Sequence, residues 1–98
     1  MSILKMPVCM ITGLGEGTGG HTARAFANAG YRIAMLARTK ERLIKFEKEL
    51  FGSKGYVCDV SDLKHLEEIC KQIKNEMGPP EVLIHNAVKG NFEYLLKG

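Results

Sequence analysis

The sequence has little of what marks membrane-spanning or secreted proteins. Its longest apolar runs are Ile33–Ala37 and Val8–Ile11, far short of the roughly 20 residues that a membrane span needs. The first residues, Met1–Met6, carry one lysine and no apolar stretch of secretory length, so they do not resemble a signal peptide. We therefore expect no contact with a membrane and a cytoplasmic location.

Cysteine is also scarce, and positive charge is not concentrated. The three cysteines, Cys9, Cys58 and Cys70, have no CxxC spacing, which argues against a disulfide framework or a zinc site. His21 and His85 lack neighbouring ligand residues, so we expect ordinary packing or solvent roles for both and assign no metal ligand. The net charge of +3 comes from scattered Lys and Arg, and there is no Trp, so we expect no nucleic-acid partner.

What remains is the composition of an ordinary globular domain. The chain has 98 residues, of which 45% are hydrophobic and 26% are charged. This length lies at the lower end of the range for independent domains, and the charge and apolar content argue against disorder. We expect residues 1–98 to form a single domain.

Four short apolar segments predict strands, and the first two, which show no polar alternation, are expected to be buried on both faces. Three longer segments between them have apolar residues spaced three and four apart, which predicts helices. Thr39 is placed to cap the second helix, and Ser61 or Asp62 the third. The strands are predicted at Met6–Thr12, Tyr31–Ala37, Gly55–Asp59 and Glu81–His85. The first helix is predicted at Thr18–Ala29, and the second follows Thr39 and buries Leu43, Phe46 and Leu50. The third helix follows its cap with apolar residues at spacings of three and four: Leu63, Leu66, Ile69, Cys70, Ile73 and Met77. The order βαβαβαβ predicts an α/β fold with a parallel sheet.

Five glycines lie between Gly13 and Gly20, at the turn from the first strand to the first helix. Such a turn lets backbone N–H groups approach a phosphate, and the helix N-terminus adds partial positive charge. Gly15, Gly17 and Gly20 satisfy GxGxxG, although the acidic residue expected after the second strand is replaced by Arg38.

Two other arrangements of the same turn are possible. The segment 15–22 nearly matches a P-loop, but His21 stands where the phosphate-binding lysine belongs. Thr12-Gly13, followed by Gly17 and Gly19, matches TGxxxGxG. The alternative to all three phosphate-binding patterns is a mobile turn that binds no ligand and whose glycines only bring helix and sheet close together.

The TGxxxGxG pattern occurs together with Asp59-Val60 after the third strand and Asn86-Ala87 after the fourth, and this combination resembles the short-chain dehydrogenase/reductase family. The segment 37–43 is similar to the family's exit from the second strand. The resemblance covers residues 6–87. It implies a Rossmann-like, three-layer fold with strand order 3-2-1-4.

The resemblance also implies a dinucleotide site. Gly13, Gly17 and Gly19 would line the pyrophosphate, with Thr18 in the same loop. Asp59 would accept from the adenine amino group, with Val60 beside the ring, and Asn86 and Ala87 would lie near the nicotinamide-side ribose, where Val88 replaces the family's usual glycine.

Arg38 decides which dinucleotide is favoured. Its guanidinium suits a 2′-phosphate, with Thr39 as a second donor, so we expect NADP rather than NAD. Simpler alternatives remain: Arg38 as an unpaired surface arginine, and Asp59 as a cap of the turn into Ser61 and Asp62.

Catalytic residues are not expected in this chain. Family members act through a Ser and a YxxxK motif beyond the fourth strand, and Tyr94 and Lys97 are three apart rather than four. We therefore expect a fold truncated after the fourth strand, forming the NADP(H)-binding portion of an oxidoreductase that transfers hydride to or from a carbonyl or alcohol. The alternative is a noncatalytic nucleotide-binding or interaction module.

The truncated fold leaves the fourth strand at an edge of the sheet. Val82, Leu83 and Ile84 lack the lysines, prolines or bulges with which natural edges resist pairing. We expect self-association through this strand, or a partner chain that supplies the next one.

Overall fold

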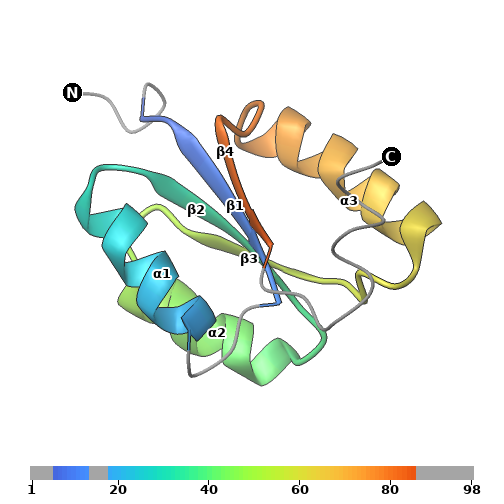
Figure 1. Ribbon diagram of the computed structural model, residues 1–98, viewed down its shortest axis with the longest axis horizontal. Helices are drawn as coiled ribbons and strands as arrows, with labels where there is room; N and C mark the ends of the chain where they lie inside the picture. Colours follow the sequence, from blue (N-terminus) through green and yellow to red (C-terminus); the bar gives the residue numbers. More distant parts are fainter. Residues whose placement is uncertain (1–5, 14–17, 86–98) are drawn as a thin grey trace.

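The computed structural model describes residues 6–13 and 18–85 (Figure 1). Within these residues, four strands alternate with three helices, as the sequence predicts. None of the described helices is long and apolar enough to cross a bilayer. The elements are β1 (Val8–Thr12), α1 (Thr18–Asn28), β2 (Arg32–Ala37), α2 (Lys40–Glu49), β3 (Lys54–Val57), α3 (Leu63–Glu76) and β4 (Val82–His85).

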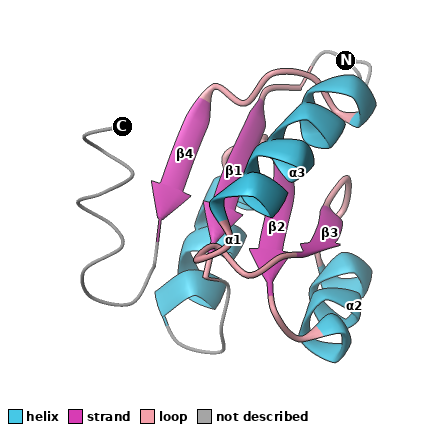
Figure 2. Cartoon of the chain, turned by 90° about the vertical axis from the view of Figure 1, so that its right-hand side faces the viewer, coloured by secondary structure: helices cyan, strands magenta, loops and turns pink. Residues whose placement is uncertain are grey.

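The strands form one parallel sheet in the order β3-β2-β1-β4. Figure 2 shows all four arrows pointing the same way, with α3 across one face of the sheet and α1 and α2 on the other. The prediction of a three-layer α/β fold with strand order 3-2-1-4 is confirmed.

Each face of the sheet has its own apolar core, because alternate residues of a strand point to opposite faces. On the α3 face, Met10, Leu36 and Tyr56 pack with Ile73. On the other face, Ile11, Ile33 and Met35 pack with Phe46 of α2 and Ala23 of α1. Every residue of β1 and β2 is buried as a result, which explains their continuous apolar runs.

Several predicted details differ from the structure. β3 ends at Val57 rather than Asp59, although the Cys58 amide still donates to the Ala37 carbonyl over 2.9 Å. Leu63 is 52% exposed because it is the first residue of α3, ahead of the turns that pack on the sheet. Asp62, one of two predicted caps, accepts from the His65 amide over 3.1 Å.

Close packing holds α2 against the edge strand β3. A Cβ added at Gly55 would lie 2.7 Å from the Cβ of Leu43, so only glycine fits there. Glu47 accepts from the Gly55 amide over 2.6 Å and thereby occupies a backbone donor of this edge strand. Lys54 and Tyr56 both donate to Glu76, which fastens β3 to the end of α3.

Arg32 fastens the amino-terminal end of the sheet. Its side chain is buried, and its guanidinium donates to the Met77 carbonyl over 2.6 Å and to the Met6 carbonyl over 3.1 and 3.2 Å. The Met77 carbonyl lies at the carboxyl end of α3, where a cation also stabilises the helix dipole. These bonds join β2, α3 and the segment before β1 at the end of the sheet opposite to the predicted site.

Candidate functional site

The predicted site residues follow the carboxyl ends of the four strands. In the sheet register, Thr12 of β1 lies opposite Leu36 and His85, and Ala37 of β2 lies opposite Val57. Because the strands are parallel, the turns that leave them meet at one edge of the sheet. The fold therefore gathers the described residues of the predicted site at this edge.

The glycine-rich turn begins with Gly13, whose φ of 67° is in the left-handed region that favours glycine. α1 then starts at Thr18, so Thr18 and Gly19 form its first turn, and this turn carries no acidic residue. Gly17 lies outside the described residues. The described part of the turn thus combines a left-handed glycine with a helix N-terminus, an arrangement that favours anions.

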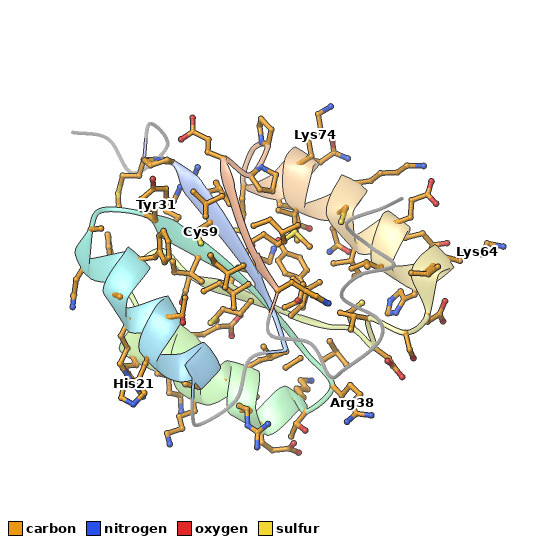
Figure 3. The ribbon with its side chains drawn as sticks, viewed as in Figure 1. Cys9, His21, Tyr31, Arg38, Lys64 and Lys74 are labelled. Carbon is orange, nitrogen blue, oxygen red and sulfur yellow. The ribbon has the colours of Figure 1, made fainter. Side chains whose placement is uncertain are left out.

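Arg38 follows β2 at the same edge and is exposed. Figure 3 shows its side chain extending outward beyond the end of the sheet. Thr39 is the N-cap residue of α2, with φ −105° and ψ 114°, but its hydroxyl makes no capping hydrogen bond. The predicted cap is thus correct in position only, and the hydroxyl is not committed to the backbone of α2.

Asp59 lies in the turn after β3. Its Oδ1 accepts from the Ser61 amide over 2.9 Å and from the Ser61 hydroxyl over 2.7 Å. These two bonds hold the pKa of Asp59 below its ordinary value, and the positive charge of Arg38 adds to the lowering. Asp59 is therefore an ionised acceptor within electrostatic reach of Arg38.

Val60, the neighbour of Asp59, is partly buried and packs against the core on the α3 face. Its side chain is thus held by the fold at the turn after β3. Asn86 and Ala87 lie outside the described residues, and the structure places neither of them.

The structure adds a contact that the sequence does not reveal. Thr12 Oγ1 and His85 Nδ1 are hydrogen-bonded across the ends of β1 and β4, although the residues lie 73 positions apart. Thr12 is buried, and burial lowers the pKa of His85. Only the register of β1 against β4 identifies the pair, so motif spacing alone could not have found it.

The family model that describes short chain dehydrogenases matches residues 7–95, which is most of the chain. This chain belongs to the short-chain dehydrogenase family. The family implies a fold that binds a nicotinamide dinucleotide at the carboxyl edge of the sheet, where the structure gathers the residues described above.

Curated relatives of this chain include oxidoreductases from several organisms. An uncharacterized oxidoreductase of Mycobacterium bovis is 31% identical over 91 residues, covering 86% of this chain and 27% of the relative. A 3-oxoacyl-[acyl-carrier-protein] reductase of Thermotoga maritima is 33% identical over 88 residues, covering 86% of this chain and 36% of the relative. An NADPH-dependent pterin aldehyde reductase of Arabidopsis thaliana is 29% identical over 89 residues, covering 88% of this chain and 37% of the relative. The chain thus spans about a third of the length of these relatives.

Solved structures show the same fold. An actinorhodin polyketide ketoreductase with NADPH superposes with a TM-score of 0.83 and 30% identity, covering 91% of this chain and 36% of that one. An NAD⁺-bound xylitol dehydrogenase gives a TM-score of 0.74 and 30% identity, covering 79% and 31%. The structural neighbours of this chain therefore include both NADPH-bound and NAD⁺-bound proteins.

Proposed function

We propose that this chain is the NADP(H)-binding portion of a short-chain dehydrogenase-type oxidoreductase, in which hydride moves between the cofactor and a carbonyl or alcohol. Residues 1–98 would act as one cofactor-binding domain, in the cytoplasm. The proposal assigns this chain to binding and orienting the cofactor, and it assigns no catalytic residue here.

The observation that carries the choice of NADP(H) is the position of Arg38. The residue directly after β2 is the one that the bound adenosine ribose meets in this fold, and here it is an exposed guanidinium rather than a carboxylate. A guanidinium can bond a 2′-phosphate through two parallel N–H groups. The Thr39 hydroxyl, which makes no capping bond, and the N-terminus of α2 support the same ligand.

The remaining site residues have complementary roles in this proposal. Gly13, Gly17, Thr18 and Gly19 bind the pyrophosphate, Asp59 accepts from the adenine amino group beside Val60, and Asn86 and Ala87 lie near the nicotinamide-side ribose. The left-handed Gly13 and the start of α1 at Thr18 support the first role. Asp59 supports the second because its ionised carboxylate has a second oxygen besides the Oδ1 that Ser61 occupies. A P-loop function is not supported, because the family model covers the turn as part of a dehydrogenase.

Titration of the chain with NADPH and with NADH tests this function. We expect both to bind, with NADPH preferred. Binding of neither at millimolar concentration, by a chain shown to be folded, would favour the alternative of an interaction module without cofactor.

The alternative function, an interaction module, is favoured by one specific observation, the β4 edge of the sheet. Within the described ranges β4 pairs with β1 alone, and Leu83 at its centre is 58% exposed. The opposite edge strand, β3, carries Lys54 and has its Gly55 amide occupied by Glu47, two features that discourage pairing. We propose that β4 is the edge at which a further strand adds, from another copy of this chain or from a partner.

A further inference from the structure

Ser61 holds the carboxylate of Asp59 from two sides of its own chain. Its amide donates to Oδ1 of Asp59 over 2.9 Å, and its hydroxyl donates to the same oxygen over 2.7 Å. Because both donors belong to one residue, the second bond fixes only one further side-chain rotation. The sequence predicts Ser61 only as one of two candidate helix caps, and the structure gives that role to Asp62. The hydroxyl of Ser61 therefore has a task that the sequence does not reveal.

The backbone of the turn after β3 is held by contacts that do not involve the Ser61 hydroxyl. The Cys58 amide donates to the carbonyl at the end of β2 over 2.9 Å, and the Asp62 amide donates to the Asp59 carbonyl over 2.9 Å. Val60, between them, packs against the core on the α3 face. These contacts fix the path of the chain, so the hydroxyl acts on the carboxylate alone.

The orientation of the Asp59 carboxylate is the property that the hydroxyl controls. The torsion that turns a carboxylate is soft, and an exposed aspartate such as Asp59 samples a broad range of it unless hydrogen bonds restrain it. Two bonds to Oδ1 fix the plane of the group and leave Oδ2 as the oxygen for a ligand. A group that is already held in its binding orientation loses less freedom when the ligand arrives, and the affinity rises accordingly.

The same bonds keep Asp59 ionised. The Ser61 hydroxyl contributes most to the lowered pKa of Asp59, the Ser61 amide comes next, and the positive charge of Arg38 adds to the effect. An ionised carboxylate accepts hydrogen bonds and cannot donate them. Oδ2 therefore favours a base that presents an amino group and disfavours one that presents a carbonyl oxygen in the same place.

We propose that Ser61 is a positioning residue for adenine recognition, which acts through Asp59 by holding Oδ1 so that Oδ2 faces the adenine amino group. The inference rests on the proposed function for its ligand. It adds a residue that helps to select adenine over a base with a carbonyl at the same position, such as hypoxanthine.

The binding experiment uses NADH and the deaminated form of NADH, which carries hypoxanthine in place of adenine. Isothermal titration compares the wild-type chain with Ser61→Ala and with Ser61→Thr, which keeps the hydroxyl. We expect Ser61→Ala to weaken NADH binding roughly three- to tenfold without weakening the deaminated form, because only adenine has the amino group. Ser61→Thr should retain the wild-type affinities.

Ser53→Ala is the matched control for the loss of a serine hydroxyl. The Ser53 hydroxyl donates to the Leu50 carbonyl over 2.6 Å at the opposite end of β3, so its removal should leave the binding of both dinucleotides unchanged. Equal weakening of NADH and its deaminated form by Ser61→Ala would limit the hydroxyl to the stability of the turn and would overturn the proposal. In an Asp59→Ala background, Ser61→Ala should have no further effect on NADH binding, and a full additional loss would equally overturn it.

A second readout needs no cofactor. In NMR titrations of the free chain, the Asp59 carboxyl should titrate at a higher pH in Ser61→Ala than in the wild type and in Ser61→Thr, because the main cause that lowers its pKa is removed. An unchanged titration would overturn the restraint of Asp59 by Ser61. If the titration shifts but the folded wild-type chain binds neither dinucleotide, the proposed function fails while the restraint stands. If NADH binds and Ser61→Ala leaves its affinity unchanged, the proposed function stands and the positioning role fails.

Discussion

Asp59 Oδ1 accepts two hydrogen bonds from Ser61, one from its amide over 2.9 Å and one from its hydroxyl over 2.7 Å. This pairing stabilises the turn after β3, as the simpler interpretation of Asp59 requires. It leaves Oδ2 as the oxygen for a ligand. The two roles of Asp59 are therefore compatible in one side chain, and a single substitution can separate them.

Asp59→Asn separates them because Asn keeps one oxygen for Ser61 and replaces the other acceptor with an NH₂ donor. Facing the adenine amino group, that donor would repel it. We expect NADPH affinity to fall by roughly tenfold while the melting temperature changes little. Asp62→Asn is the matched control, since Asn also caps helices well. Isothermal titration measures the affinities, and wild-type affinity in Asp59→Asn would limit Asp59 to its role in the turn.

Gly55→Ala tests the packing of α2 against β3. The added Cβ would lie 2.7 Å from the Cβ of Leu43, which cannot swing away because it is attached to the helix backbone. We expect the free energy of unfolding to fall by about 1 to 3 kcal/mol. Val57→Ala, at an exposed position of the same strand, is the control and should cost much less. Urea denaturation measures both, and equal losses would show that α2 moves away from β3 at little cost.

Glu76→Gln tests the pH dependence of the link between β3 and α3. Hydrogen bonds lower the pKa of Glu76 from 4.5 to about 2. The bond from Lys54 contributes most, followed by the bonds from Gln72 and Tyr56. Because the folded pKa is the lower one, the ionised carboxylate stabilises the fold above pH 4.5, and that contribution is lost as pH falls from there toward 2.

The wild-type chain should therefore be more stable than Glu76→Gln near neutral pH, and the two should converge below pH 4.5. Urea unfolding at a series of pH values gives the comparison. Glu68→Gln is the control, because its carboxylate lies on α3 in an exposed position. A stability difference between wild type and Glu76→Gln that stays constant down to pH 2 would contradict the assigned bonds.

Leu83→Lys tests the proposed pairing of β4. Leu83 is the suitable position because it is 58% exposed, whereas its neighbours Val82 and Ile84 pack against the core on the α1 and α2 face. We expect the wild-type chain to form dimers or larger species at high micromolar concentration, and the lysine to make it monomeric. Size-exclusion chromatography with light scattering measures this, with Val57→Lys on the β3 edge as the control. A wild-type chain that stays monomeric and cooperatively folded would contradict the proposal.

The apolar pattern was enough to predict the α/β class and the parallel sheet, and the family resemblance supplied the strand order. β1 and β2 read as unbroken apolar runs because helices cover both faces of the sheet. The errors lie at element ends, where packing decides the outcome. Leu63 continues the apolar spacing of α3, yet its position in the first helical residue leaves it exposed.

The site was predictable only in part, because some of its contacts depend on strand register rather than on local sequence. Gly13, Arg38 and Asp59 are each recognisable from their place after a strand. Pairs such as Thr12 and His85 depend on the register of two strands that are distant in sequence, and no local pattern contains that information. The structure does not describe Gly17, Asn86 or Ala87, and their roles stay predictions.

Arg38→Ala tests the central claim, that Arg38 directs this site toward NADP(H). Isothermal titration of wild type, Arg38→Ala and Lys64→Ala with NADPH and with NADH gives six affinities. Lys64→Ala removes the same charge from an exposed position on α3 (Figure 3) and controls for general electrostatic attraction. We predict that Arg38→Ala weakens NADPH binding roughly ten- to hundredfold and leaves NADH binding nearly unchanged, because only NADPH carries the 2′-phosphate. Equal weakening of both dinucleotides by Arg38→Ala would contradict the assignment.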